Sequence, residues 1–553
     1  MKPTILRSTV AVILLSGVGL SITHFEQPMQ GQPAPAKVAQ LRESVSATHC
    51  IGCHAGEKSP AYQEYKDEKR TEFIRLDEYH TWNELDLHRI AHKNITPSEK
   101  GGPNGGPNLA WKMQAALQQD QNRQVNGKAY QVERAAECLA CHAVDLSWNA
   151  LNSTALPIDK SMMDDEKTPR FSTRFGVSCE ACHGYADKWL GEHFKISWRD
   201  KKPEDKLKEF GQVDLRSPRV RAERCASCHV GSKDEGKFVS HEMYAAGHPP
   251  LPVFEMANYG REQPAHYYPA NANEAYKKMF DDEQKNKKPD IPASVRNRFH
   301  YRPDEIGEAR DVAIGAIVGF RNNVKLLEHD AGNLKDGELL DFAHFDCAAC
   351  HHDLKSPSDR QNRRGGIPGR PLMKVPTELL EVVVDHASNL EGAGRELNTE
   401  SYHRFSKELE GLRTAFDARP FGNPVEIEKS AKSLNELSSK MLDDLENRAF
   451  RRDPKMGLQQ AISARLLKLG EAKDGYLDHD SAQQLAWALR ALIVKPSEKS
   501  VALAQTIGLS LREPVLKTPP QSVESRLPER LKKEKEYESR KFLKAINEWM
   551  NGD

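Results

Sequence analysis

Five C-x-x-C pairs, each followed directly by histidine, constrain this chain more than any other feature. The ten cysteines of the 553-residue sequence form the pairs Cys50 and Cys53, Cys138 and Cys141, Cys179 and Cys182, Cys225 and Cys228, and Cys347 and Cys350. The histidines that follow them are His54, His142, His183, His229 and His351. With 21 histidines in the chain, five such placements arise by chance with a probability on the order of one in ten million. The pattern C-x-x-C-H is the attachment signature of c-type haem, so we expect five covalently bound haem c groups.

The spacing within each motif suits this chemistry. Two thiols three positions apart can each add to a haem vinyl group, and the next histidine then lies under the ring and ligates the iron. Porphyrins would fill much of the interior, in keeping with 38% hydrophobic residues and a mean hydropathy of −0.70. Zinc ribbons also use C-x-x-C pairs but need no histidine after each one. A thioredoxin-like redox site or a vicinal disulfide would occur once or twice, not five times.

The overall charge excludes two classes of protein. Lys plus Arg and Asp plus Glu both number 80, which gives a net charge of zero. A balanced chain has no general field that attracts nucleic acid, so we expect no nucleic-acid partner. A composition with 29% charged residues is also unlike that of a multi-span membrane protein.

The amino terminus has the pattern of a targeting segment. Lys2 and Arg7 precede an apolar run over residues 9–22, which is shorter than the ~20 residues that span a bilayer. We predict a signal peptide or N-terminal anchor over residues 1–26, followed by a flexible leader over residues 27–44. Export to the periplasm follows, and contact with a membrane would come only through an uncleaved anchor.

Four further histidines are predicted to be second axial ligands of the irons. They are His88, His193, His241 and His248. His88 lies in the run EYHTWNELDLHRIAH, for which we predict one helix with His88 and His92 on the same face, four positions apart. We expect His92 and His80 to pack on a haem edge instead.

The positions of the other three ligands suggest which irons they serve. His193 follows the third motif so closely that it would reach a neighbouring haem more easily than the far side of its own. His241 and His248 are seven positions apart, or about 10 Å along a predicted helix, so they must serve different irons. Gly247 and the two prolines after His248 predict that this helix ends there, with His248 in its last turn.

The sequence leaves the second ligand of the fifth iron open. The candidates are His266, His300, His344 and His352. An iron without a second protein ligand can bind a small molecule, which keeps an enzymatic alternative open. Arg221, Arg224 or His352 could then supply protons or stabilise charge beside such an iron.

Several runs of residues resemble the multihaem c-type cytochromes of the cytochrome c-554 type. They are VSCEACHGYADKWLGEHF, RAERCASCHVG, VSHEMYAAGHPPLPVFE and FDCAACHHDL, within a match that covers about residues 50–354. WNELDLH resembles the W-x-x-x-D-x-H segment that carries a distal ligand in that family. The resemblance implies periplasmic electron transfer through stacked haems with mostly bis-histidine ligation, sometimes with one five-coordinate iron. The fifth motif and everything after Leu354 depart from the tetrahaem members.

We predict a mainly α fold with little regular sheet. A pentahaem cytochrome c domain is expected over residues 45–362, a linker over 363–376 and a haem-free α-helical bundle over 377–553. Within the haem domain a helix is expected from about 303 to 328. The bundle prediction depends on apolar residues at three- and four-residue spacings, such as Leu434, Leu437, Met441 and Leu445.

Electron transfer is the function that these patterns favour. We expect five haems to carry electrons between redox partner proteins in the periplasm or the membrane, at low potentials because the ligation is bis-histidine. The alternative is a multihaem oxidoreductase that reduces or oxidises a small nitrogen or sulfur species at a five-coordinate haem. The number of irons that lack a second protein ligand distinguishes the two.

Overall fold

The computed structural model describes most of the chain from residue 45 onward. The described residues are 45–59, 62, 74–102, 106–119, 124–125, 128–143, 175–195, 197–198, 201–285, 300–303, 305–335, 337–351, 373–389, 399–418, 420–446, 457–472, 476–492 and 537–551. The predicted targeting segment, the leader and His352 lie outside them. No helix in the described ranges has the length and apolar character that crossing a membrane requires.

Helices make up nearly all of the regular structure, which confirms the predicted mainly α fold. The first α-helices are α1 (Ile51–His54), α3 (Glu78–Leu85), α4 (Leu109–Leu117), α5 (Ala136–His142), α8 (Cys179–His183), α9 (Pro203–Asp205), α10 (Pro218–His229), α11 (His241–Ala246), α12 (Met256–Glu262) and α13 (Glu274–Lys285). The later ones are α15 (Gly307–Gly332), α16 (Cys347–Cys350), α17 (Glu378–Ser388), α18 (Thr399–Asp417), α19 (Pro424–Glu446), α20 (Leu458–Glu471), α21 (His479–Leu492) and α24 (Ser539–Asn551).

Short elements complete the described structure. The 3-10 helices are η1 (Ala47–His49), η2 (Gly56–Lys58), η4 (Leu87–Ile95), η6 (Val132–Arg134), η10 (Lys233–Glu235), η11 (Ala270–Ala272) and η12 (Phe342–His344), and η9 (Lys206–Phe210) is a π-helix. The strands β1 (Gln124–Val125) and β2 (Lys128–Ala129) pair antiparallel. Regular sheet is therefore limited to this one small hairpin within the described residues.

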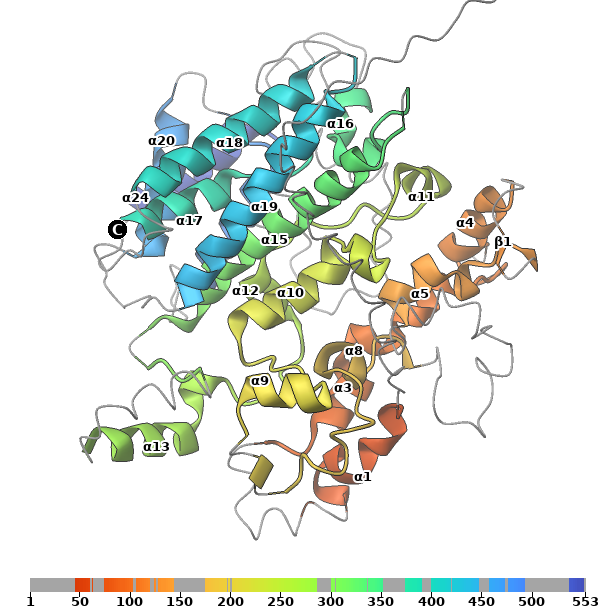
Figure 1. Ribbon diagram of the computed structural model, residues 1–553, viewed down its shortest axis with the longest axis vertical. Helices are drawn as coiled ribbons and strands as arrows, with labels where there is room; N and C mark the ends of the chain where they lie inside the picture. Colours follow the sequence, from red (N-terminus) through yellow and green to blue (C-terminus); the bar gives the residue numbers. More distant parts are fainter. Residues whose placement is uncertain are drawn as a thin grey trace, which may run out of the picture. The chain divides into compact units, whose positions relative to one another are not determined.

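Helix α15 is the element on which much of the core is built. It packs against α10 and α12 of the predicted haem domain, and against α17, α19 and α21 of the predicted bundle. Figure 1 shows α15, α18 and α19 running alongside one another. One hydrophobic cluster accordingly contains Ala226 before the predicted linker and Leu434 after it. The two predicted domains thus share buried apolar contacts.

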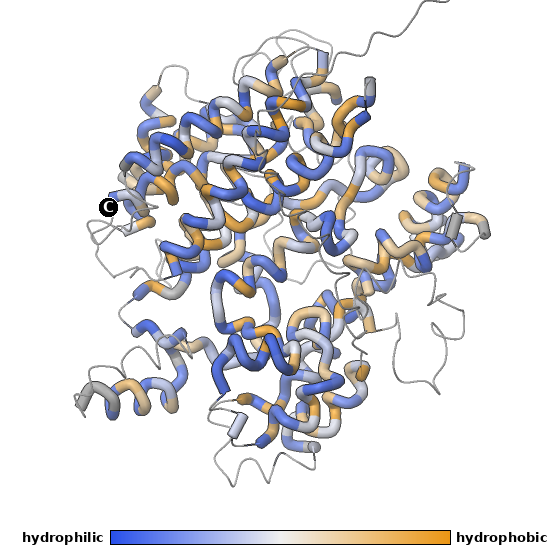
Figure 2. Tube along the Cα trace, viewed as in Figure 1, coloured by the Kyte–Doolittle hydropathy of each residue, from blue (hydrophilic) through white to orange (hydrophobic). Residues whose placement is uncertain are grey.

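The periodic apolar residues of the predicted bundle face its interior. Leu434, Leu437, Met441 and Leu445 of α19 are all at most 3% exposed. In Figure 2, hydrophobic and hydrophilic residues alternate along α18 and α19, as amphipathic helices require. The C-terminal helix α24 buries Phe542 and packs against α20. Its apolar face is therefore used inside this chain.

Close packing of α12 on α15 depends on a glycine. A Cβ atom at Gly315 would come within 2.4 Å of the Met256 Cβ atom, which is attached to backbone and cannot turn aside. We expect Gly315→Ala to lower the free energy of unfolding by about 1–3 kcal/mol, since overpacked cores must shift to relieve such contacts. Denaturant unfolding would measure this effect.

A matched control is available on the neighbouring helix. Gly260 of α12 has no atom within 4 Å of the position of an added Cβ. Gly260→Ala should therefore leave stability unchanged or raise it by up to about 1 kcal/mol, because alanine favours helix. Equal destabilisation by both substitutions would contradict the role assigned to Gly315.

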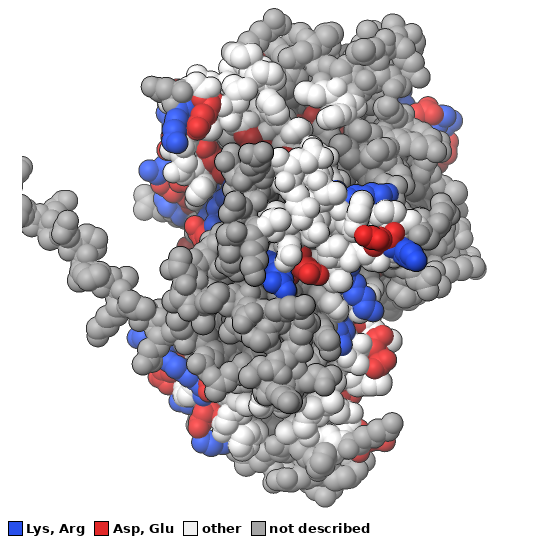
Figure 3. Space-filling model, turned by 90° about the vertical axis from the view of Figure 1, so that its right-hand side faces the viewer, with Lys and Arg blue, Asp and Glu red and all other residues white. Residues whose placement is uncertain are grey.

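Charges of both signs are distributed over the described surface. On the face drawn in Figure 3, Lys and Arg side chains lie beside Asp and Glu side chains. Arg219 of α10, for example, pairs with Asp443 and Glu446 of α19. These ion pairs add polar contacts between the two predicted domains at the protein surface.

Candidate haem sites

The first four C-x-x-C-H motifs each lie at the C-terminal end of a helix. The helices α1, α5, α8 and α10 all have the motif histidine as their last residue. Helical geometry puts the two cysteines and the histidine on about one turn, so their side chains share one end of the helix. In the fifth motif, α16 covers Cys347–Cys350 and His351 follows directly.

The first motif shows how the backbone gathers these side chains. The backbone N–H groups of Cys53 and His54 both donate to the Cys50 carbonyl, at 3.2 and 2.9 Å. This turn holds the two cysteines and the histidine together, and both Cys50 and Cys53 are partly buried. No disulfide joins any of the ten cysteines. The Cys50 and Cys53 thiols are therefore arranged as attachment to one porphyrin requires, and they are not consumed by a bond to each other.

Three pairs of imidazoles face each other at nearly the same distance in the described part of the chain. The ring centres are 6.2 Å apart in His54–His193, 6.1 Å in His88–His229 and 6.3 Å in His142–His248. The interplanar angles are 14°, 85° and 68° in the same order. Each pair contains one motif histidine and one histidine predicted as a second ligand.

This distance fits two ligands on opposite sides of one iron. An imidazole nitrogen lies about 2 Å from the metal it ligates, and the ring centre lies about 1 Å further back, so two rings across one iron have centres roughly 6 Å apart. Ordinary aromatic pairs cover about 4.5–7 Å, so the distance alone does not identify a ligand pair. What points to iron is that the same distance recurs three times, each time between a motif histidine and a predicted second ligand. The donor residues present therefore fit bis-histidine haem at the first, second and fourth motifs.

The hydrogen bonds of these rings leave one nitrogen of each available for iron. In every case Nδ1 contacts an oxygen: Glu78 Oε2 for His54 (2.8 Å), Asp86 Oδ1 for His88 (2.8 Å), Ala91 O for His142 (3.1 Å), Leu190 O for His193 (2.8 Å) and Pro249 O for His248 (2.7 Å). Metal-ligating histidines nearly always donate their second ring N–H in this way. Among the described residues, Nε2 of these five rings has no hydrogen bond, as a ligand atom requires.

Burial keeps several of these imidazoles in the form that ligates metal. It is the main cause that lowers the pKa of His229 and of His248 to about 4, and it lowers the pKa of His142. Neutral imidazole is the ligating species, so no proton has to be removed near neutral pH. At His54 burial acts in the same direction, but the hydrogen bond and the charge of Glu78 outweigh it and raise the pKa.

Sequence reasoning predicted one helix through His88 and His92, and the structure corrects this. Helix α3 ends at Leu85, and the chain continues from Leu87 as the 3-10 helix η4. Asp86 lies between them, and its carboxylate accepts a hydrogen bond from the His88 backbone N–H (3.0 Å) and faces the His88 ring. The break turns His88 toward His229, while His92 remains further along η4.

The backbone of His88 is held against the segment before the third motif. Val177 N–H donates to the His88 carbonyl at 2.9 Å. Gly176 has a φ of +58°, and a Cβ there would come within 2.4 Å of the same carbonyl. Glycine is therefore required at this approach. Trp82 adds a hydrogen bond from its indole N–H to Val177 O at 3.1 Å.

The helix around His241 and His248 is also shorter than predicted. Helix α11 ends at Ala246, and Gly247 adopts a left-handed φ of 113°. His248 consequently lies just after the helix rather than in its last turn, where its ring contacts Tyr244 and faces His142. The expectation that His241 and His248 serve different irons is untouched by this change.

Contacts between thiols show which motifs are neighbours. An interaction with Cys179 lowers the pKa of the Cys50 thiol, so the first and third motifs lie together. Another such interaction lowers the pKa of Cys228 and raises that of Cys141, so the fourth and second motifs lie together. Burial raises the pKa of Cys182 to about 12, and the nearby Cys225 and Cys228 of the fourth motif add to the rise. The motifs thus follow the spatial order first, third, fourth, second.

The third and fifth motif histidines lack such a partner among the described residues. No imidazole faces His183 or His351 at about 6 Å in that part of the chain. Burial, and then the charge of His266, lowers the pKa of His183 to about 4, so His266 is an imidazole in its vicinity. His300 contacts Asp214, with 3.9 Å between Nε2 and Oδ2. His80 is exposed.

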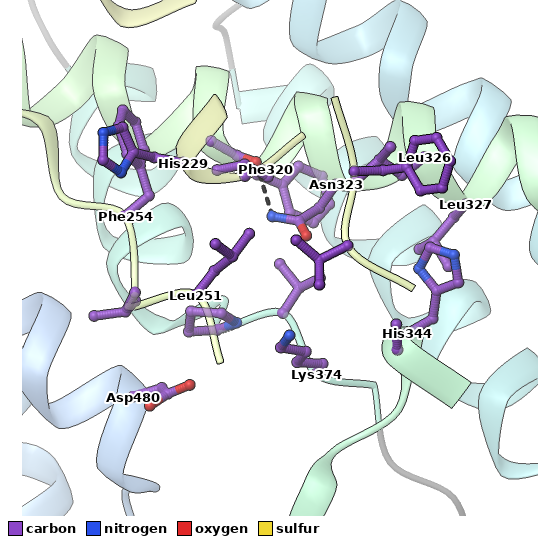
Figure 4. A pocket seen from close by; sticks show the side chains of 18 of the residues that line it. His229, Leu251, Phe254, Phe320, Asn323, Leu326, Leu327, His344, Lys374 and Asp480 are labelled. Carbon is purple, nitrogen blue, oxygen red and sulfur yellow. Dashed lines mark hydrogen bonds between the residues drawn. The ribbon is translucent and has the colours of Figure 1, made fainter. Parts of the chain in front are cut away.

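A cavity of about 110 Å³ lies along α15 beyond the fourth motif. Figure 4 shows apolar side chains such as Leu251, Phe254 and Phe320 on its walls, with His229 toward one end and His344 toward the other. Lys374 enters it and donates a hydrogen bond to the Tyr244 hydroxyl at 3.3 Å. Its small volume suits water or a small solute, not a porphyrin.

Sequence reasoning missed the groups that orient the ligands. Glu78 is 24 residues from His54 in sequence, so no local motif links the two. Ala91, Leu190 and Pro249 contact the histidines through backbone carbonyls, so their residue types could not indicate this role. Asp86 could have been found from the sequence, because it is the acidic residue of the W-x-x-x-D-x-H segment that contains His88.

Comparison with known proteins supports the assignment to haem chemistry. Residues 108–184 match the family described as "Cytochrome c554 and c-prime", a stretch that contains the second and third motifs. Searches of curated proteins and of solved structures gave no match. The family match supports haem-based electron transfer by this chain.

Proposed function

From this match and the three imidazole pairs, we propose that the chain is an exported electron carrier with five covalently bound haem c groups. The observation that carries the proposal is the repeated distance of 6.1–6.3 Å between a motif histidine and a second histidine. Haem iron bound at each site would supply a one-electron couple. With both axial positions filled by protein, such sites transfer electrons and leave no position for a substrate.

The neighbouring motifs support transfer through the protein. The first and third motifs are in contact through Cys50 and Cys179, and the fourth and second through Cys228 and Cys141. Haems attached to these thiols would lie close together. The third motif adjoins the fourth through Cys182. A continuous path then leads from the first motif to the second through the third and fourth.

The carboxylate partners predict differences in potential along this path. His54 and His88 contact Glu78 and Asp86, whereas both ligands of the second motif contact carbonyls. A carboxylate raises the basicity of a ligating imidazole and stabilises the ferric state. The first and fourth haems should therefore have lower potentials than the second.

Glu78→Gln tests this reasoning at the first motif. Loss of the negative charge should raise the potential of one haem by roughly 60 mV, which equals a tenfold change for a one-electron couple. A spectroelectrochemical titration would measure it. Glu84→Gln on the same helix is the control, because Glu84 is exposed and contacts Asn83 rather than a ligand. An unchanged or lower potential in Glu78→Gln would contradict the assignment.

The proposal as a whole is tested by electron paramagnetic resonance of the oxidised protein with haem quantified on the same sample. We expect five haems per chain, of which at least the first, second and fourth are low-spin. Fewer than three low-spin haems would contradict bis-histidine ligation by the three imidazole pairs. Fractionation of the producing cells tests export, for which the amino-terminal pattern is the support.

A second candidate function depends on the third motif. The second ligand of an iron bound there is not assigned: no imidazole faces His183 at about 6 Å among the described residues, and His266 is the imidazole in its vicinity. The alternative is then an oxidoreductase that acts on a small nitrogen or sulfur species at this haem. Arg221 is not free to assist, since it binds Asp311 at 2.8 and 2.9 Å. One high-spin haem with turnover of such a species would support this candidate over a carrier.

The partners proposed for the carrier are redox proteins of the periplasm or the membrane. The balanced charge and the mixed ion pairs of the described surface support protein partners over nucleic acid. Electron transfer from the reduced chain to a candidate acceptor, followed at the Soret band, would test each partner.

A further inference from the structure

We infer that His241 is the second axial ligand of the iron attached at the fifth motif, so that α11 joins the ligand spheres of two neighbouring haems. This inference rests on the proposed function, because it requires a haem at Cys347 and Cys350. It assigns the ligand that sequence reasoning left open.

His241 lies beside the segment that leads into the fifth motif. A single carboxylate oxygen, Asp341 Oδ1, accepts hydrogen bonds from the His241 backbone N–H at 2.9 Å and from the Ala343 N–H at 2.8 Å. Asp341 therefore fixes the first residue of α11 against η12. Cys347 comes five positions after Phe342, a span of at most roughly 18 Å even when fully extended.

The His241 ring is placed at this junction. It contacts Phe342 edge to face, with ring centres 5.5 Å apart and an interplanar angle of 88°. Phe342 also contacts Phe345, two residues before Cys347. The imidazole thus lies against η12, the segment that leads into the fifth motif.

The His241 imidazole is still available as a ligand. It is partly buried, and neither ring nitrogen has a hydrogen bond among the described residues. The other three predicted second ligands already face the histidines of the first, second and fourth motifs. His241 is the one predicted second ligand that these pairs leave over.

His344 is the alternative ligand nearest in sequence to the fifth motif, and its ring already makes another interaction. His344 Nε2 contacts Asp330 Oδ2 at 2.8 Å, and Lys233 binds the other oxygen of this carboxylate at 2.9 Å. In Figure 4 the His344 ring lies at the wall of the cavity along α15. Ligation through Nε2 would require this partly buried contact to break. His329 contacts Asp330 only through Nδ1, but its side chain is 49% exposed and lies on α15, not beside the segment that leads into the fifth motif.

In this arrangement, the two ends of α11 supply ligands to two different irons. His241 begins the helix, and His248, just beyond its end, faces His142 of the second motif. A helix of six residues then bridges the second and fifth irons. The path from the first motif would continue through the second motif to the fifth.

His241→Ala in the full haem-loaded protein tests the inference. We expect one additional high-spin haem per chain in the resonance spectrum, together with binding of carbon monoxide to one further haem after reduction. The same substitution in a Cys347→Ala/Cys350→Ala background, which lacks the fifth haem, should add no high-spin signal. His241→Met should keep the haem low-spin but raise its potential, which covers the case in which the alanine variant folds poorly.

His344→Ala is the matched control and should leave all spin states unchanged. No new high-spin haem in His241→Ala, or a high-spin haem that persists without Cys347 and Cys350, would overturn the inference and leave the carrier proposal intact. A high-spin haem in His344→Ala would overturn it in favour of His344. A wild-type content of four haems, with none at the fifth motif, would overturn both the inference and the five-haem proposal.

Discussion

Replacing Cys225 and Cys228 with alanine should remove one haem and divide the proposed path into two parts. The fourth motif lies between the other motifs, since Cys228 interacts with Cys141, and Cys225 and Cys228 lie close enough to Cys182 to add to the rise in its pKa that burial causes. We expect haem content to fall from five to four per chain. Reduction of the second haem by electrons that enter at the first should also lose its fast phase. Pyridine haemochrome analysis and stopped-flow reduction would measure the two effects.

The control for this prediction is Cys347→Ala/Cys350→Ala, which removes the haem at one end of the path. Haem content should again fall by one, but transfer between the first and second haems should keep its wild-type rate. If both double variants slow that transfer equally, the fourth motif is not between the others, and the order inferred from the thiol contacts is wrong.

Arg310→Met should cause the largest loss of stability of any single substitution considered. The guanidinium of Arg310 binds both oxygens of Glu305, at 2.8 and 3.0 Å, and donates to Leu445 O at 2.8 Å. The Arg310 and Glu305 side chains are 5% and 1% exposed. Removal of Arg310 leaves the buried Glu305 carboxylate without its two short hydrogen bonds and with the Arg302 guanidinium at 3.8 Å. The free energy of unfolding should therefore fall by about 3 kcal/mol.

Urea unfolding followed by circular dichroism would measure this loss. Two further variants test whether the loss comes from the buried charge. Glu305→Gln combined with Arg310→Met should recover part of the stability, because the buried carboxylate that has lost its closest cation is gone. Lys541→Met removes an ion pair with Glu538 whose lysine is 75% exposed, and it should cost no more than about 0.5 kcal/mol. An equal loss in Arg310→Met and Lys541→Met would contradict the importance of burial.

Much of the fold could be predicted from apolar periodicity. The helix expected over residues 303–328 is α15 at Gly307–Gly332, and the stripe from Leu434 to Leu445 lies on α19. Periodicity could not show that α15 packs on α19, because any amphipathic helix can bury its face against several partners. Contacts such as Arg310 with Leu445 O join residues 135 positions apart, and no local pattern encodes them.

The candidate sites were predictable in their components but not in their pairing. Each C-x-x-C-H motif supplies one candidate ligand histidine, and the sequence also offered His88, His193, His241 and His248 as candidate second ligands. Which histidine faces which motif depends on tertiary contacts, as in the close approach of Gly176 to the His88 carbonyl. The break at Asp86 was missed because an acidic residue inside an apolar period is compatible with a continuing helix.

The shared core between α10 and α15 has an electrostatic consequence for the fourth motif. Ala222 and Ala226 of α10 are fully buried in the cluster that also holds α19. One side of the helix that ends in His229 is therefore in contact with hydrocarbon, where the dielectric constant is far below that of water. Low dielectric disfavours the more highly charged oxidation state of a bound iron. The helices after the predicted linker would thus raise the potential of an iron bound at His229, opposing the ferric stabilisation that Asp86 would provide through His88.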